Sequence, residues 1–236
     1  MLDLVGSVVG MATFGVILVA VSAALDLGGA GRLSLGAIAG GWVGLASGLG
    51  AAGEFQFSPN SPAPLIGVFV VTPLLIVGGL AFANRGFRSA LLAIPTSLLI
   101  GLNSMRVLGV LFLLLSFDGR LSGPFPFSAG LGDIITGVVA VPLALMTARS
   151  RSLPAAAIAP WNFFGALDLV AAIALGITSA NGSPLQLIHV GVGSDAMQAL
   201  PFCLVPTVLV PFYLITHGVV AAQLAAHRPQ AALSHA

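Results

Sequence analysis

Long apolar stretches separated by short polar segments make up most of the chain. The stretches are roughly 18–28 residues long and cover about residues 4–25, 33–52, 65–83, 90–117, 129–146, 157–178 and 200–224. A helix needs about 20 apolar residues to cross the hydrocarbon core of a bilayer, whereas a membrane barrel strand has about ten residues that alternate between polar and apolar. These stretches do not alternate. The pattern therefore predicts an all-α integral membrane bundle of seven transmembrane helices.

The arginines predict how this bundle is oriented. Six arginines follow the first, third, fifth and seventh spans: Arg32, Arg85, Arg88, Arg149, Arg151 and Arg228. The segments on the other side contain only Arg120. Cytoplasmic loops carry an excess of basic residues. We therefore expect the N-terminus outside and the C-terminus in the cytoplasm.

The same pattern gives the expected domain organisation and location. Residues 1–226 are predicted to form a single seven-helix transmembrane domain, and residues 227–236 a short cytoplasmic tail. The first span is interpreted as a retained helix, because Asp3 precedes it and a signal peptide has a positive N-terminal region. We expect a multi-pass protein of the bacterial inner membrane, with the lipid bilayer as its main partner.

Composition excludes several classes of function. Only 6% of the residues are charged, against about 25% in an average soluble domain. A net charge of +1 provides no basic surface for nucleic acid. The single cysteine, Cys203, excludes an intrachain disulfide and cysteine-based metal clusters. The chain has no lysine, so a retinal Schiff base is excluded, and any other cofactor is unknown.

Four ionisable residues lie inside the predicted spans: Arg106, Asp133, Asp168 and His217. Such residues are costly in a bilayer, so they face the bundle interior and find partners. At 1.5 Å per residue, Arg106 lies about 16 Å from the outer end of its span and Asp133 about 6–7 Å below the same surface. This predicts a buried ion pair, acting as a gate or as a structural link. Asn103 lies one turn before Arg106 and is expected to join it.

Asp168 and His217 form a second predicted pair. They lie about 16 Å and 12 Å from the inner ends of their spans, near the middle of the membrane. Trp161 shares the helix face of Asp168, and Tyr213 shares that of His217. These four residues are the predicted ligand or proton site. The alternative is a helix-to-helix hydrogen bond without a further role.

Two prolines interrupt the backbone hydrogen bonding of the seventh span. Pro206 and Pro211 each free a carbonyl about one turn earlier, because proline has no backbone N–H. Free carbonyls near an aspartate and a histidine are consistent with an ion or proton site.

Glycines recur at four-residue spacing in the second span. Gly36, Gly40, Gly44 and Gly48 lie on one face of the predicted helix, where another helix can approach closely. This face is expected to pack either within the bundle or against a second copy in a homodimer.

Three classes of function remain. The favoured hypothesis is a membrane protein that binds or translocates a small polar molecule or a proton through a site in the bundle. The alternative is a structural or assembly subunit whose buried charges only fix helix packing. A metal or haem enzyme is disfavoured, because zinc needs about three converging ligands and no third one accompanies Asp168 and His217. Enzymatic activity is therefore not expected.

Several short segments resemble bacterial multi-pass membrane proteins of unassigned function. They are RVLG at 106–109, AGLGDI at 129–134, WN and GALDL within 161–169, VPT and LVP within 205–211, and His217. The resemblance covers about the last 130 residues. It implies no activity, but it contains the same arginine, aspartates and histidine.

Overall fold

The computed structural model describes residues 1–25, 27–57, 65–150 and 153–233, with side chains described up to residue 227. In these residues the chain is helical without β-strands, and seven helical segments are long and apolar enough to cross a membrane. Five of these segments are single helices: α1 (Leu2–Ala24), α2 (Gly29–Ala52), α3 (Leu65–Ala83), α7 (Phe125–Arg149) and α8 (Ala155–Ser179). The other two, Thr96–Phe117 and Val205–His227, each combine regular helix with a segment of irregular helix. The all-helical class and the seven apolar spans are thus confirmed.

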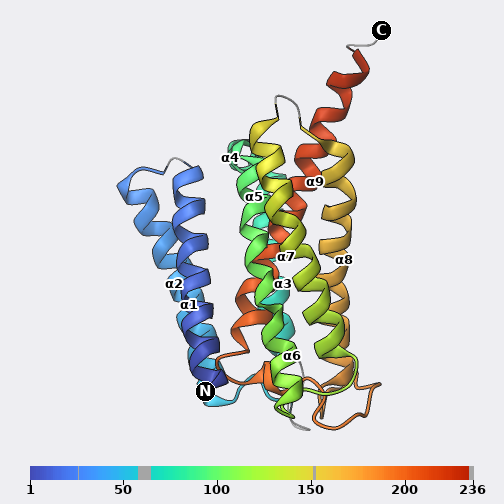
Figure 1. The fold of residues 1–236 in the computed structure, drawn as a ribbon. Helices are drawn as coiled ribbons and strands as arrows, with labels where there is room; N and C mark the ends of the chain where they lie inside the picture. Colours follow the sequence, from blue (N-terminus) through green and yellow to red (C-terminus); the bar gives the residue numbers. More distant parts are fainter. Residues whose placement is uncertain (26, 58–64, 151–152, 234–236) are drawn as a thin grey trace.

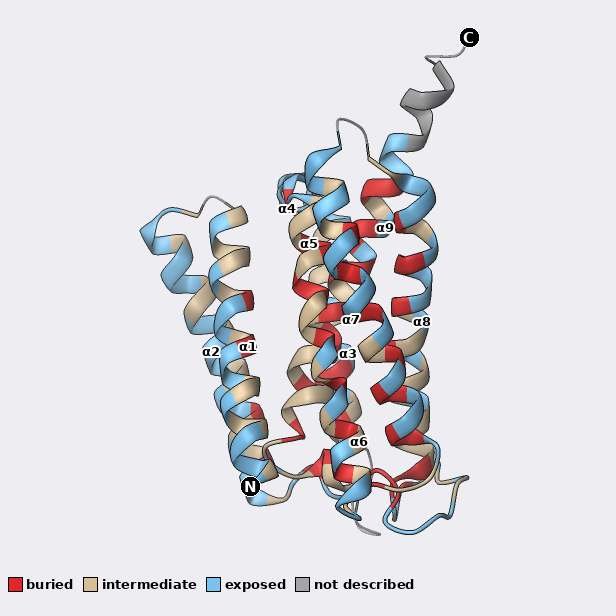
Figure 2. Ribbon diagram, viewed as in Figure 1, coloured by how far each residue is buried: buried red, intermediate tan, exposed pale blue. Residues whose placement is uncertain are grey.

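The helices form two groups (Figure 1). A hairpin of α1 and α2 lies on one side of a bundle that contains the remaining spans, and the two termini lie at opposite ends. Buried residues are concentrated in the bundle, whereas the hairpin is mostly exposed (Figure 2). In a membrane protein such exposed apolar surface faces lipid or another protein. The hairpin is therefore a peripheral part of the fold.

The hairpin is fastened to the bundle at a proline-interrupted helix. The Trp42 indole donates a hydrogen bond to the Thr207 carbonyl at 2.9 Å. This carbonyl is free because Pro211, four residues later, has no N–H to donate. Nearby, a Cβ on Gly50 would lie 2.6 Å from the Cys203 sulfur, so only glycine permits this approach. The freed carbonyl thus serves packing, where an ion or proton ligand was expected.

The fourth span begins later than the sequence suggested. The predicted span from residue 90 is divided at Pro95 into α4 (Arg85–Ala93) and α5 (Thr96–Leu102). Ile94 is extended, because the residue before a proline disfavours the helical region. α4 exposes Arg85 and Arg88 at the end of the bundle, as a helix lying along a membrane surface does.

Gln223 of α9 (Val210–Leu233) holds this break in place. Its side-chain amide donates to the carbonyls of Ile94 at 2.7 Å and Leu92 at 3.1 Å. It also accepts a hydrogen bond from the Thr96 hydroxyl at 2.8 Å. α9 therefore supplies hydrogen-bond partners both to the end of α4 and to the start of α5. Sequence reasoning did not single out Gln223.

Two segments of irregular helix flank the centre of the bundle. η1 (Asn103–Gly109) is a 3-10 helix that leads into α6 (Val110–Phe117), and η3 (Val205–Leu209) is a π-helix that leads into α9. In η1, the Asn103 side chain donates to the Leu99 carbonyl at 2.9 Å and so competes with regular backbone bonding. In η3, Pro206 has no N–H to donate. Such segments are frequent at hinges and functional sites.

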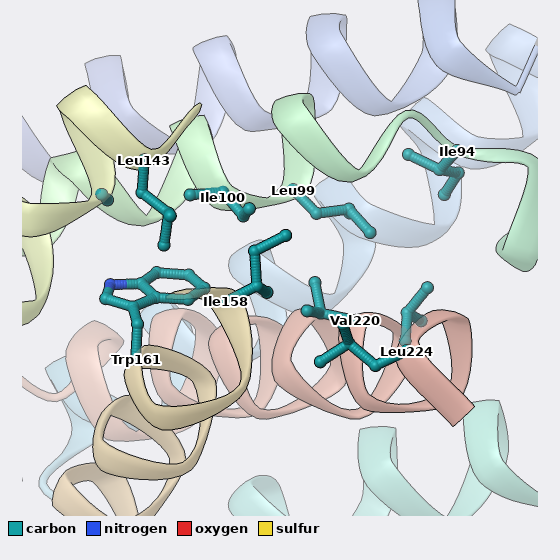
Figure 3. Packing of buried hydrophobic residues seen from close by; sticks show 10 residues of the cluster. Ile94, Leu99, Ile100, Leu143, Ile158, Trp161, Val220 and Leu224 are labelled. Atoms are coloured by element: carbon teal, nitrogen blue, oxygen red, sulfur yellow. The ribbon is translucent and has the colours of Figure 1, made fainter. Parts of the chain in front are cut away.

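Apolar layers fill the bundle towards both ends. One layer is shown in Figure 3 and contains Ile94, Leu99, Ile100, Leu143, Ile158, Trp161, Val220 and Leu224. The other layer contains Phe112, Leu115, Leu121, Phe125, Ala129, Met197 and Phe202. In each crossing segment of the bundle core, the first layer lies towards the α4 end and the second towards the opposite end. The middle of the bundle is thus enclosed between them.

The predicted glycine face of α2 makes no close packing contact in the described part of the chain, although Gly40 borders the cavity between the hairpin and the bundle. A Cβ at Gly36, Gly40, Gly44 or Gly48 would meet no atom within 4 Å. This face does not pack within the bundle, which was one of the two arrangements expected. A homodimer through α2 remains a prediction.

The described arginines outside the polar cluster lie near the ends of the helices. Arg149 ends α7 and Arg32 lies in the first turn of α2, at the same end of the molecule as α4 (Figure 1). At the opposite end, Arg120 pairs with Asp3 at 2.8 Å. Arg151 lies outside the described residues, and the orientation in the membrane remains a prediction.

Replacing Trp42 by Phe tests the attachment of the hairpin. The variant keeps an aromatic ring but leaves the Thr207 carbonyl without its donor, which we expect to cost about 1–3 kcal/mol. Thermal unfolding of the purified protein in detergent measures the change. Phe82→Leu is the control, because Phe82 is 95% exposed. Equal melting temperatures for Trp42→Phe and the wild type would show that this bond does not hold the hairpin.

Candidate functional site

The Arg106 guanidinium is the centre of a buried polar cluster. Arg106 lies in η1 and is 2% exposed. Its Nε donates to Asp133 Oδ1 of α7 at 2.6 Å, and its Nη2 donates to Asp168 Oδ2 of α8 at 2.6 Å. Charge-assisted bonds of this length are the strongest hydrogen bonds that side chains form. One arginine therefore joins two carboxylates from two helices.

The remaining Arg106 contacts determine the protonation state and the tautomer of His217. Arg106 Nη1 donates to the Gly165 carbonyl and to His217 Nε2, each at 3.1 Å. Because Arg106 can only donate, His217 Nε2 must accept, and the ring proton lies on Nδ1. This Nδ1 donates to Asn162 Oδ1 at 2.9 Å, and the Asn162 amide donates to the His217 carbonyl at 3.1 Å. The network thus assigns a neutral imidazole to His217.

Two aromatic side chains border the cluster. The Trp161 ring packs on His217 with 5.2 Å between centroids, and its indole donates to the Thr136 carbonyl at 3.0 Å. The Tyr213 ring lies 5.8 Å from the Arg106 guanidinium carbon, a distance at which cation–π attraction acts. Tyr213 is 5% exposed, and its hydroxyl is not among the fully buried side-chain atoms without a partner in the described residues, which are Asn103 Oδ1 and Thr136 Oγ1.

Glycines let the charged helices approach each other. A Cβ on Gly132 would overlap the Asp168 carboxylate, and one on Gly165 would lie 2.6 Å from His217 Cε1. At the η1–α7 contact, a Cβ on Gly109 would lie 2.5 Å from that of Asp133. These glycines, and Asn162, were missed from the sequence. Each lies within six residues of a predicted charged residue and inside one of the short segments that carry the family resemblance, but neither observation assigned it a role.

The cluster has more acidic than basic groups. In the described residues, Asp133 and Asp168 form salt bridges only with Arg106. With both carboxylates ionised and His217 neutral, the cluster carries one negative charge in excess. Charges interact far more strongly in a protein interior than in water. The excess charge therefore favours binding of a proton or another cation.

The structure merges the two pairs that the sequence predicted. Arg106 and Asp133 do pair, but Asp168 and His217 are not hydrogen-bonded to each other, and both bind Arg106 instead. The predicted difference in depth was wrong, because α7 begins at Phe125, four residues before the expected start of the span. Asp133 therefore lies about 6 Å deeper, at the level of Arg106.

Asn103 lies beside the cluster without binding it. Its amide donates to the Leu99 carbonyl at 2.9 Å and to the Thr216 hydroxyl at 3.2 Å. The expected hydrogen bond to Arg106 is absent among the described residues. Asn103 therefore shapes η1 and contacts α9, one residue before His217.

Three hollows reach the cluster from different directions. A cavity of about 230 Å³ lies between the hairpin and the bundle and contacts Arg106, Asp133 and Tyr213. A smaller cavity of about 80 Å³, bordered by Ser194 and Gln198, also contacts Asp133. A shallow groove between α8 and α9 contacts Asn162 and His217. Asp133 and His217 are thus reached from separate sides.

The described residues contain no group of three or more His, Cys, Asp or Glu side chains that could hold a metal ion. The contacts of Arg106 with Asp133, Asp168 and His217 are electrostatic and hydrogen-bonding interactions.

Comparison with known proteins gives one match. Residues 62–225, well over half of the chain, match the model of a domain of unknown function, DUF8737. This range begins after the α1–α2 hairpin and includes the whole polar cluster. No curated protein and no solved structure matches the chain.

Replacing Gly132 by Ala tests the close approach of α7 and α8. The added methyl group overlaps the Asp168 carboxylate. Overpacking typically costs about 1–3 kcal/mol, which we expect to appear as a lower melting temperature. Gly78→Ala in α3 is the matched control, since its methyl group meets nothing within 4 Å. Equal melting temperatures for the two variants would contradict the observed contact.

Removing Arg106 should damage the protein more than removing its partners. Arg106→Gln leaves two buried carboxylates without a cation, which typically costs about 3–5 kcal/mol. The triple variant Arg106→Gln, Asp133→Asn, Asp168→Asn removes all three charges and should recover part of this stability. The melting temperatures of the wild type, the single variant and the triple variant give their order of stability. Additive losses, with the triple variant the least stable, would contradict the ion cluster.

Proposed function

Because the chain belongs to this family of domains of unknown function, we propose its function from the site itself: the protein binds a proton, or a small polar molecule that carries positive charge, at the Arg106 cluster and moves it across the membrane. The observation that carries this proposal is that one buried guanidinium is shared by two carboxylates. A cation that binds there neutralises the excess charge.

The surroundings of the cluster support transport rather than permanent binding. Apolar layers of the described residues lie towards both ends of the bundle, with the polar cluster between them. Asp133 borders two cavities, while His217 borders the groove between α8 and α9. Arg106 contacts both residues. A shift of η1 or η3 would therefore change which side of the cluster is accessible.

The irregular helices give the motion a structural basis. η1 carries Arg106, and η3 precedes α9, which carries Tyr213 and His217. Broken helices near the membrane centre are a recurring feature of transporters. The arginine asymmetry supports an N-terminus outside and a bacterial inner-membrane location.

A structural or assembly role is the second candidate. Its support is that the single Arg106 side chain connects η1 to α7, α8 and α9 through hydrogen bonds. Such a cluster can fix helix packing without any ligand. The exposed glycine face of α2 would then contact a second copy of the chain.

Proton flux into proteoliposomes distinguishes the two candidates. Vesicles loaded with a pH-sensitive dye are exposed to an inward proton gradient, and flux is compared with protein-free vesicles. We expect flux from the wild type and at least a tenfold loss in Asp168→Asn. Asp118→Asn is the matched control, because Asp118 is exposed at the end of α6.

Stability measured on the same variants completes the test. Asp168→Asn leaves a balanced Arg106–Asp133 pair, so its melting temperature should equal or exceed that of the wild type. Lost flux with retained stability supports the proposed function. Wild-type flux in Asp168→Asn, or no flux above protein-free vesicles for the wild type, would contradict it and favour the structural role.

A further inference from the structure

The cavity between the hairpin and the bundle has an apolar body and one polar end. Its volume is about 230 Å³. The apolar wall combines α1, α2 and the bundle, with Gly10, Phe14, Val43, Phe112 and Leu209 among its residues. The polar end consists of Arg106, Asp133 and Tyr213. This form suits a molecule with an apolar tail and a polar head.

Two polar atoms at this end have no partner among the described residues. The Tyr213 hydroxyl forms no side-chain hydrogen bond with the described residues, and Asp133 uses Oδ1 to bind Arg106, so its Oδ2 stays available. Neither atom is fully buried: the fully buried side-chain atoms without a partner in the described residues are Asn103 Oδ1 and Thr136 Oγ1. Both available atoms therefore belong to the accessible polar end of the cavity. Both groups line the cavity, so a ligand there can satisfy them together.

The charges identify the kind of head group. With Asp133 and Asp168 both ionised, the two carboxylates outnumber the Arg106 guanidinium, and the cluster repels an anionic head. A primary ammonium group carries three N–H donors, so it can donate to both Asp133 Oδ2 and the Tyr213 oxygen. The Tyr213 ring also attracts cations. A neutral alcohol would supply only one hydrogen-bond donor and would not neutralise the negative charge of the cluster.

We propose that this cavity binds a lipophilic primary amine, with its ammonium group at Asp133 and Tyr213 and its tail between the hairpin and the bundle. The proposal rests on the proposed function, because both depend on the excess negative charge of the Arg106 cluster. The hairpin lies outside the family match at 62–225, so it adds this wall to the shared part of the fold. A ligand of this kind enters sideways from the bilayer.

Binding of dodecylamine to the full chain in nanodiscs tests this site. Equilibrium dialysis with labelled dodecylamine is compared with empty nanodiscs, with dodecanol and dodecanoate as probes of the same chain length. We expect saturable amine binding at least tenfold tighter than that of either probe. Equal binding of amine and alcohol would overturn the proposal and indicate that ordinary lipid chains fill the cavity.

Two glycines of α1 provide matched variants. Gly10 lines the cavity and Gly15 does not, and a Cβ at either position meets no atom within 4 Å. Gly10→Leu should fill the cavity and abolish saturable amine binding, whereas Gly15→Leu should keep it. Tyr213→Phe should weaken amine binding several-fold. If Gly10→Leu does not fold, the amine binding of Tyr213→Phe is the test of the proposed site. Binding that is unchanged in both Gly10→Leu and Tyr213→Phe would overturn the proposal.

Proton flux without amine, measured on the same preparations, separates the two proposals. Absent amine binding with flux that still depends on Asp168 overturns only the amine site. Amine binding that follows Gly10 and Tyr213, with flux that is indifferent to Asp168→Asn, supports the site and overturns only the proposed transport.

Discussion

An arginine enclosed by protein in the middle of a membrane bundle must find all its partners within the chain, and this requirement organises the fold. Arg106 uses four of its five N–H groups on Asp133, Asp168, Gly165 and His217. The Arg106 side chain itself is fully covered, and apolar layers lie on both sides of it along the bundle. The same enclosure makes the extra carboxylate important. A simple ion pair would be neutral, whereas this cluster attracts a proton or a cation.

The helix geometry follows from the same requirement. Gly132 and Gly165 have no side chain, so Asp168 and His217 can reach the centre from α8 and α9. The Asn103 side chain bonds to the Leu99 carbonyl where η1 begins, and Pro206 interrupts the backbone where η3 begins. As a consequence, two irregular helices lie beside the Arg106 cluster. In the described part of the chain, this is the only salt-bridge cluster with more than two members. The hairpin then closes one side, with Trp42 bound to a carbonyl that Pro211 leaves free.

The seven spans could be predicted because length and hydropathy alone decide whether a helix can cross a bilayer. The four charged residues could also be found, since burial in lipid makes each of them costly. Their joining into one cluster could not, because it depended on where α7 begins: one extra helical turn from Phe125 brings Asp133 to the depth of Arg106. Gly132 and Gly165 lie in segments that carry the family resemblance, but nothing in those segments indicates that helices meet there. The regular series in α2 was the stronger packing signal, yet a Cβ at any of its four glycines meets no described atom within 4 Å.

Infrared spectroscopy of the carboxyl groups tests the central claim most directly, because a protonated carboxylic acid and a carboxylate absorb at different frequencies. The purified protein is titrated in lipid without added amine, alongside Asp168→Asn. Exposed carboxyl groups also protonate at acid pH, so the informative band is the one that persists near neutral pH, where exposed carboxyl groups are ionised. The account predicts such a band in the wild type, which disappears reversibly as the pH rises further and is absent from Asp168→Asn. A wild-type protein without this band near neutral pH, or an unchanged band in the variant, would contradict a cluster that exchanges a proton.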